Sequence, residues 1–196
     1  MLRQKGMDFP LDLNKKLNIA HINVCTEAEG PYRRMAIWFQ GCNILCDGCC
    51  NPQLQEIKVA HIMTVQEVLD IALESKKENG IEGVTFLGGE PTLQEGMIHL
   101  AKALAIEGIG IILFTGKAFK SLDTKITNVI DLIIDGRFEL SQIDLERNLV
   151  GSKNQQIIYV TDRYIDSKDW FLKAREKRVE ISFDKGSGLF INGDVL

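Results

Sequence analysis

Residues 83–116 read "GVTFLGGEPTLQEGMIHLAKALAIEGIGIILFTG", and this run indicates the fold class. It opens with a short apolar stretch closed by glycines and continues with a segment of helical periodicity. It ends with a second apolar stretch that is closed by a Thr-Gly pair. A strand, a crossover helix and a second strand in this order form the repeating unit of a parallel sheet. The sequence therefore predicts an α/β protein.

The same alternation continues on both sides of this unit. Further strands are predicted at residues 18–24, 34–41, 129–136, 155–161 and 179–184, with helices at 64–80 and 167–178. Five or six parallel strands in 196 residues fall short of a closed eight-stranded barrel, which takes about 250 residues. We therefore expect a partial (β/α) barrel, with an open doubly wound sheet as the alternative. Residues 1–16 are expected to form a polar N-terminal extension, and residues 17–196 a single domain.

Composition excludes several classes of protein. Hydrophobic residues make up 45% of the chain and charged residues 26%, as in an ordinary globular protein. The net charge of −4 gives no general attraction to nucleic acid. The most basic run, residues 168–178, is interpreted as the solvated face of a helix, with a docking surface for an acidic partner as the alternative. No run reaches the roughly 18 apolar residues of a membrane span, and no signal peptide is recognisable, so we expect a cytoplasmic protein without membrane contact.

Four of the five cysteines lie in residues 41–53, "GCNILCDGCCNPQ", called the cysteine segment below. Cys42, Cys46 and Cys49 form a C-x3-C-x2-C pattern, and Cys50 follows directly. In the reducing cytoplasm such crowding indicates metal or redox chemistry, because thiolates favour zinc, copper(I) and iron–sulfur clusters. Structural zinc normally takes four ligands, whereas three cysteines leave one iron of a 4Fe–4S cluster open. The spacing favours such a cluster, and zinc or a role without metal remain the alternatives.

Small and polar residues follow each predicted strand. These stretches are "GGEPT" (88–92), "FTGK" (114–117) and "DGRFE" (135–139), while "VGSKNQ" (150–155) precedes the next strand. Each stretch alone is a common turn former. Because functional residues gather at the carboxyl ends of parallel strands, we expect them to form one site with the cysteine segment.

Together these segments resemble the radical S-adenosylmethionine (SAM) superfamily. Its signature is C-x3-C-x2-C after the first barrel strand, followed by a GGEP-type turn after the second. Within it, the chain is most similar to the activating enzymes of anaerobic ribonucleotide reductase, which are glycyl-radical enzyme activases. The motifs "GPYRRMAIWFQGC", "CDGCCN", "GGEP", "FTG", "DGRFE" and "GSKNQ" occur in that order between residues 18 and 159.

The resemblance implies a role for each motif. Cys42, Cys46 and Cys49 would bind a 4Fe–4S cluster, and SAM would chelate its open iron. The implied SAM contacts are Gly48, Cys49 and Cys50 beside the adenine, Gly88, Gly89 and Glu90 at the amino end, and Thr115, Asp135, Ser152 and Asn154 along the rest of the pocket. Arg137 is our inferred partner for the SAM carboxylate.

The resemblance also implies a reaction and its partners. An electron from the cluster would cleave SAM to methionine and a 5′-deoxyadenosyl radical, which removes a hydrogen atom from a glycine of a partner protein. The implied partners are the large subunit of anaerobic ribonucleotide reductase and, as electron donor, flavodoxin or ferredoxin. No catalytic acid–base pair is required. The alternatives are a radical SAM enzyme that modifies a small molecule or peptide, similar to 7-carboxy-7-deazaguanine synthase, and a non-catalytic iron–sulfur or zinc module.

Two features depart from the family pattern. The usual Gly-Pro-Gly turn stands here as Gly30-Pro31-Tyr32, and we expect the tyrosine to narrow or reshape the edge of the site. The polar N-terminal extension is also longer than a minimal activase requires. Both departures bear on the substrate and leave the cluster prediction unchanged.

Overall fold

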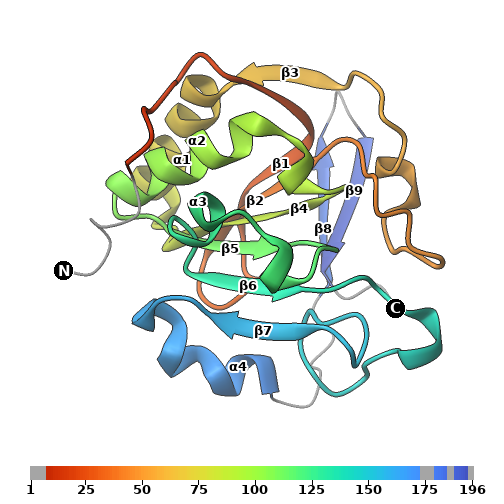
Figure 1. Ribbon diagram of the computed structural model, residues 1–196. Helices are drawn as coiled ribbons and strands as arrows, with labels where there is room; N and C mark the ends of the chain where they lie inside the picture. Colours follow the sequence, from red (N-terminus) through yellow and green to blue (C-terminus); the bar gives the residue numbers. More distant parts are fainter. Residues whose placement is uncertain (1–7, 173–178, 185–187, 194–196) are drawn as a thin grey trace.

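A computed structural model describes residues 8–172, 179–184 and 188–193, and its centre is a seven-stranded sheet (Figure 1). The strands are β1 (Lys16–Thr26), β2 (Arg34–Phe39), β3 (His61–Thr64), β4 (Gly83–Gly88), β5 (Gly110–Phe114), β6 (Leu132–Asp135) and β7 (Gln156–Tyr159), in the order β3-β1-β2-β4-β5-β6-β7. The helices are α1 (Val65–Asn79), α2 (Glu95–Ile106), α3 (Thr124–Thr127) and α4 (Lys168–Leu172), with 3-10 turns η2 (Pro52–Leu54), η3 (Pro91–Leu93), η4 (Phe119–Ser121), η5 (Leu140–Gln142) and η6 (Asp162–Ser167). β8 (Val179–Asp184) and β9 (Gly188–Gly193) pair separately.

The α/β prediction is confirmed, although the number of neighbouring parallel strands is corrected from five or six to four. β2, β4, β5 and β6 are neighbours and run parallel. β1 and β7 flank them and run antiparallel to β2 and β6, respectively. The segment joining β6 to β7 contains no crossover helix, and a parallel partner would require one. β3 and β9 had not been expected.

Helices α1, α2 and α3, which connect the parallel strands, lie on one face of the sheet (Figure 1). Each connection moves from a strand to the next neighbour in one direction, β2 to β4 to β5 to β6. Right-handed crossovers that all advance in the same direction place their helices on the same side. A doubly wound sheet would carry such helices on both faces, so the arrangement is the partial (β/α) barrel, open at β3 and β7.

Apolar residues of the inner strands alternate between two cores. Ile111 and Leu113 of β5 pack with α1 and α2 in the larger core. Ile112, between them, points to the opposite face and packs with Tyr164 of η6 and Phe171 of α4. Both faces of the inner strands are covered, which explains why these strands read as continuous apolar runs.

The helix boundaries follow local signals. At the start of α1, Thr64 forms a capping box with Glu67, and Gly80 ends the helix with φ of 66°. The predicted stop at Asn79-Gly80 is confirmed. The described part of the predicted basic helix is α4, and residues 173–178 lie outside the described residues. Among the described helices, none has both the length and the apolar character of a membrane span.

The described part of the N-terminal extension packs on α2. Phe9 lies edge-to-face with His99 at 5.7 Å between ring centroids, and Leu13 contacts the larger core. The backbone N–H of Asp12 donates to Nδ1 of His99 at 3.1 Å. Residues 8–15 therefore contribute to the helical layer of the domain.

Tyr32 lies at the amino-terminal edge of the sheet, opposite the cysteine segment. It precedes β2, whose first residue, Arg34, pairs with Gly83 at the start of β4. The cysteine segment instead follows the last residue of β2. The expectation that Tyr32 narrows the edge of the site is therefore wrong. Its φ of 64° forms the turn into β2, and its hydroxyl accepts a hydrogen bond from Ser167 at 3.3 Å.

A fully buried arginine holds this amino-terminal edge together. Nη1 of Arg34 donates to Oε2 of Glu82 at 3.1 Å and to the Tyr164 hydroxyl at 2.9 Å. Tyr164 in turn donates to Oε2 of Glu82 at 2.7 Å, so the three side chains form a closed network. Nε of Arg34 donates to Thr85, and Nη2 donates to the Val84 carbonyl. The network joins β2, β4 and η6.

This network predicts a loss of stability at high pH. Burial raises the pKa of Tyr164 to about 12, so the neutral hydroxyl stabilises the fold fully below pH of about 10, and this stabilisation is lost as the pH rises through about 12. We expect the free energy of unfolding to fall over that range by about 3 kcal/mol more in the native protein than in Tyr164→Phe. Urea denaturation followed by circular dichroism measures it, and equal pH slopes would contradict the assignment.

Candidate functional site

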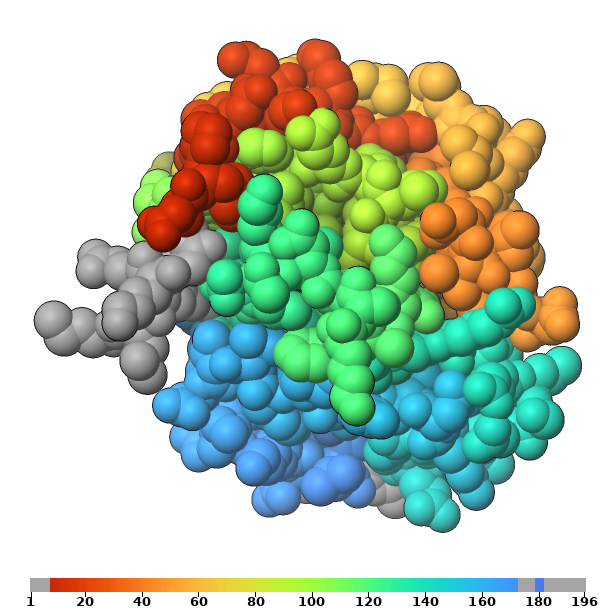
Figure 2. All heavy atoms as spheres, viewed as in Figure 1, coloured from red at the N-terminus to blue at the C-terminus, as the bar shows by residue number. Residues whose placement is uncertain are grey.

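The predicted motifs gather at the carboxyl-terminal edge of the four parallel strands. In Figure 2 the cysteine segment (orange) meets residues 136–155 (teal), called the connecting segment below, at the right-hand side of the molecule. Arg137 and Leu140 both contact the cysteine segment. Nη2 of Arg137 donates to the Leu45 carbonyl at 2.9 Å. The Leu140 side chain covers Gly48, where a Cβ would lie 3.0 Å from Leu140 Cδ1.

The antiparallel direction of β7 brings the "GSKNQ" residues to this edge. Asp135 at the end of β6 pairs with Gln156 at the start of β7. The Gln156 N–H donates to Oδ1 of Asp135 at 3.2 Å. A parallel β7 would begin at the far edge of the sheet, so the corrected direction is what places Ser152 and Asn154 beside the other motifs.

The GGEP turn supports the root of the cysteine segment. The Gly89 N–H donates to the Phe39 carbonyl at 2.8 Å, and the Glu90 N–H donates to the Gly41 carbonyl at 2.9 Å. A Cβ on Gly89 would lie 2.2 Å from the Gly41 oxygen, and a Cβ on Gly88 would lie 2.4 Å from the Phe39 nitrogen. Gly88 and Gly89 thus allow a close approach to the backbone that leads into the cysteine segment. The contacts of these two glycines with SAM stay predictions.

Glu90 links the ends of β4 and β5. Its carboxylate is 1% exposed and accepts hydrogen bonds from Thr92, from Thr115 Oγ1 at 2.8 Å and from the Gly116 N–H at 2.9 Å. The buried charge is therefore met by several donors, which offsets its desolvation. Glu90 fixes the Thr115-Gly116 turn, while the predicted SAM contacts of Glu90 and Thr115 stay predictions.

Asp135 and Ser152 extend this arrangement to β6 and β7. Oδ2 of Asp135 accepts from the Phe119 N–H at 2.6 Å, and Oδ1 accepts from Gln156. The fully buried Ser152 hydroxyl accepts from the Glu139 N–H at 3.1 Å. Both side chains thus hold the backbone around the site, and their predicted contacts with SAM stay predictions.

Two sulfurs of the predicted triad accept a backbone N–H. Ile44 donates to Cys42 and Asn51 donates to Cys49, both at 3.4 Å. The backbone N–H of Phe138 acts to lower the pKa of the Cys46 thiol, against the larger effect of burial. A hydrogen bond to sulfur favours the thiolate, which is the form that binds metal. Phe138 belongs to the connecting segment, so that segment shapes the surroundings of a cysteine far away in the sequence.

The thiols differ in acidity. Hydrogen bonds from the Cys50 thiol and the Asn51 N–H lower the pKa of Cys49 to about 6, although burial opposes them. Burial raises the pKa of Cys46 above its ordinary value, although the Phe138 N–H acts to lower it. Within the described residues, no three His, Cys, Asp or Glu side chains are grouped as a metal site. The assignment of Cys42, Cys46 and Cys49 as cluster ligands therefore stays a prediction.

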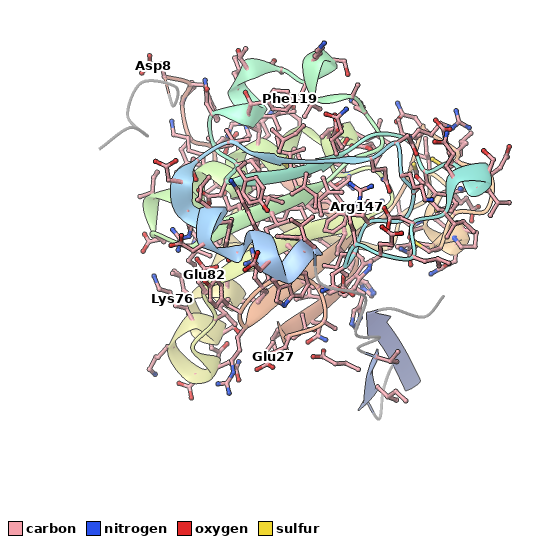
Figure 3. The ribbon with its side chains drawn as sticks, turned by 90° about the horizontal axis from the view of Figure 1, so that it is seen from below. Asp8, Glu27, Lys76, Glu82, Phe119 and Arg147 are labelled. Carbon is pink, nitrogen blue, oxygen red and sulfur yellow. The ribbon has the colours of Figure 1, made fainter. Side chains whose placement is uncertain are left out.

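An ion pair that sequence reasoning missed organises the connecting segment. Nε of Arg147 bonds Oδ2 of Asp144, which is almost fully buried, at 2.6 Å. The other guanidinium N–H groups donate to the carbonyls of Ser152 (3.3 Å), Lys153 (3.2 Å) and Gln155 (2.9 Å). Figure 3 shows Arg147 in this segment, away from Glu82. The only signal in the sequence is an Asp and an Arg three residues apart, which is equally typical of a solvated helix face.

Asn154 carries a buried oxygen without a partner. Its Nδ2 donates to the Arg137 carbonyl at 2.8 Å, so the nitrogen must face that carbonyl and the orientation of the amide is settled. Among the described residues, Oδ1 of Asn154 is the buried side-chain polar atom for which no hydrogen bond is found. An unsatisfied buried acceptor costs about 1–3 kcal/mol, so a ligand that donates here removes this cost.

Residues 28–158 match the protein family described as "4Fe-4S single cluster domain". The chain belongs to this family. The matched range contains the cysteine segment, the GGEP turn, the "FTG" and "DGRFE" stretches and the "GSKNQ" residues. The resemblance seen in the sequence is thereby confirmed, and so is the expected cofactor class, a 4Fe–4S cluster.

The relatives of this 4Fe–4S family member include two activating proteins and one synthase. The chain is 28% identical over 153 residues to the anaerobic ribonucleoside-triphosphate reductase-activating protein of Enterobacteria phage T4, covering 74% of this chain and 96% of that protein. It is 30% identical over 152 residues to the pyruvate formate-lyase-activating enzyme of Listeria monocytogenes, covering 72% and 60%. It is 38% identical over 72 residues to the 7-carboxy-7-deazaguanine synthase of Clostridium acetobutylicum, covering 36% and 31%.

The contact between the GGEP turn and the cysteine segment predicts the effect of Gly89→Ala. The new Cβ would displace the Gly41 oxygen, so we expect the free energy of unfolding to fall by about 1–3 kcal/mol and the bound iron per chain to decrease. Urea denaturation and iron analysis after anaerobic reconstitution measure both. Gly80→Ala is the control, because that left-handed glycine has no atom near its Cβ and should lose stability but keep its iron. Unchanged iron in Gly89→Ala would contradict the prediction.

The Arg147 network predicts a second effect. Lysine at position 147 keeps the charge, but its compact ammonium has three N–H donors and cannot reproduce the four hydrogen bonds that the planar guanidinium makes to Asp144 and the three carbonyls. The part of the connecting segment that holds Asn154 therefore becomes less ordered. We expect Arg147→Lys to weaken the binding of SAM by about tenfold, which equals about 1.4 kcal/mol. Equilibrium dialysis of the reconstituted protein with labelled SAM measures this. Arg163→Lys, which alters the ion pair with Glu82 at the opposite edge, should leave SAM affinity unchanged. Equal affinities in both variants would refute the positioning role.

Proposed function

We propose that this chain is a radical SAM activating enzyme that generates a glycyl radical on a partner protein, foremost the large subunit of anaerobic ribonucleotide reductase. The observation that carries the proposal is the gathering of the cysteine segment, the GGEP turn and the connecting segment at one sheet edge in a member of the 4Fe–4S single cluster family. The choice of partner is supported by similarity to the activating protein of phage T4 over 96% of its length.

The residues present fit the proposed cofactors. When bound, the cluster and SAM supply the radical chemistry, in which an electron cleaves the sulfonium of SAM to give the 5′-deoxyadenosyl radical and methionine. The backbone N–H groups that donate to the sulfurs of Cys42 and Cys49 suit thiolate ligands, because hydrogen bonds to sulfur tune iron–sulfur clusters. The unpaired Oδ1 of Asn154 suits an N–H or O–H donor of SAM.

The remaining residues position and enclose the cofactor. We place the adenine beside Gly48, whose φ of 70° keeps the chain tight against Leu140, and beside Cys50. Gly88 and Gly89 would offer backbone groups to the SAM amino end, and Glu90 and Asp135 would keep the surrounding turns in place. The exposed Arg137 lies across the cysteine segment, where we place the SAM carboxylate.

We further propose a cytoplasmic setting and an external electron donor, flavodoxin or ferredoxin. The sequence holds five cysteines, and three of them form the C-x3-C-x2-C set. The other two, Cys25 and Cys50, are too few for a second cluster of the ordinary four-cysteine kind. A separate protein would therefore deliver the electron to the cluster.

The proposal predicts a sharp difference between Cys46→Ala and Cys25→Ala after anaerobic reconstitution. The native protein and Cys25→Ala should show a reduced 4Fe–4S EPR signal that shifts on addition of SAM, and both should release 5′-deoxyadenosine. Cys46→Ala should lose the SAM-dependent shift and the product, because one of three cluster ligands is gone. With the reductase large subunit and a reductant added, the native protein should also produce the EPR signal of a glycyl radical.

Two results would overturn the proposal in different ways. Bound zinc, or a cluster whose signal ignores SAM, would leave a metal-binding module without this chemistry. Cleavage of SAM without a glycyl radical on the reductase, but with turnover of a small substrate, would favour an enzyme of the 7-carboxy-7-deazaguanine synthase kind, to which the chain is similar over 72 residues.

A further inference from the structure

We infer that a rim of exposed apolar side chains around the cysteine segment docks the partner polypeptide whose glycine is oxidised, an inference that rests on the proposed function. The rim consists of Leu45, Ile57, Val59, Leu93 and Leu140, which are 38–76% exposed. Leu45 belongs to the cysteine segment, and the other four lie outside the sequence motifs of the site. Exposed apolar side chains that gather around one segment indicate an interaction surface in soluble proteins.

Four of the rim residues belong to or adjoin the cysteine segment, and Val59 follows two positions after Ile57. A Cβ on Gly41 would lie 3.6 Å from Ile57 Cγ1 and 3.9 Å from Leu93 Cδ2, so both side chains flank the root of the cysteine segment. Leu140 covers Gly48 from the other side. Leu45 lies between them along the segment, and its carbonyl binds Arg137. The rim therefore lies on both sides of the cysteine segment.

The charges in residues 56–59 of the rim are balanced. Glu56 and Lys58 alternate with Ile57 and Val59 and form an ion pair at 2.7 Å. This stretch of the rim therefore presents two of the most exposed apolar side chains of the described residues beside a neutralised pair. Such a surface favours apolar contact with a partner over attraction by net charge.

The position of the rim also indicates the size of the substrate. A small-molecule site encloses its ligand in a concave pocket with a few convergent polar groups. The rim side chains instead face outward around the cysteine segment, where a metabolite would leave them uncovered. A polypeptide loop that delivers its glycine to the site, with apolar residues on either side, would cover them. The rim thus favours a protein substrate over a small heterocycle.

The test compares two double variants with matched chemistry. Ile57→Asp with Val59→Asp places charges on the rim. Ile106→Asp with Leu172→Asp places them on residues of similar exposure, 59% and 62%, at the ends of α2 and α4 outside the rim. Both variants should cleave SAM without partner at the native rate, because neither changes a residue assigned to the cluster or SAM.

The rim variant should need about tenfold more reductase large subunit for half-maximal glycyl radical formation, while the rate at saturation changes little. The control variant should behave as the native protein. EPR quantification of the glycyl radical against reductase concentration, with 5′-deoxyadenosine measured in parallel, gives both quantities. If the Asp variant loses basal SAM cleavage, Ile57→Ser with Val59→Ser replaces it under the same criterion.

Different outcomes would contradict the docking role of the rim and the proposed activase function. A rim variant that matches the native protein in its dependence on reductase overturns the docking role and leaves the activase function standing. A native protein that cleaves SAM but forms no glycyl radical overturns the proposed function, and the inference falls with it. If the rim substitutions change only the sedimentation of the activase alone, the rim joins two copies of this chain, and the partner assignment is refuted.

Discussion

The site depends on one steric constraint, the close approach of the GGEP turn to the chain that leaves β2. With no Cβ at positions 88 and 89, the turn bonds directly to the carbonyls of Phe39 and Gly41. The Gly41 N–H in turn donates to the Leu54 carbonyl, which returns the far end of the cysteine segment to its start. The root of the thiol-bearing segment is thus anchored to the sheet by backbone bonds on both sides.

Next to this contact, two buried carboxylates hold the loops along the same edge of the sheet by accepting hydrogen bonds from their backbone N–H groups. Glu90 holds the turn after β5, and Asp135 holds the loop after β5 together with the start of β7. Arg147 then clamps the "GSKNQ" carbonyls. Buried polar groups are normally satisfied, and the unpaired Oδ1 of Asn154 is the exception among the described side chains.

The two edges of the sheet have different roles: the amino-terminal edge holds a stabilising network, and the carboxyl-terminal edge holds the candidate site. At the amino-terminal edge, the N–H groups of Arg34 donate to Glu82, to Tyr164 and to a backbone carbonyl, and these bonds stabilise the fold. This pattern agrees with the general behaviour of (β/α) barrels, whose catalytic groups occupy the carboxyl-terminal face. It also explains the error over Tyr32, since a turn that belongs to a family motif need not lie on the side of the site.

The sequence by itself determined what depends on neighbours along the chain. The alternation of strands and helices, the end of α1 at Gly80 and the cysteine spacing were legible because periodicity, caps and short ligand patterns act over a few residues. Only the tertiary structure decided the direction of β7, the partners of Glu90, Asp135 and Arg147, and the apolar rim. These features arise from contacts between residues far apart in the chain, and a pattern of residue types does not specify which distant groups a buried charge or an exposed leucine will meet.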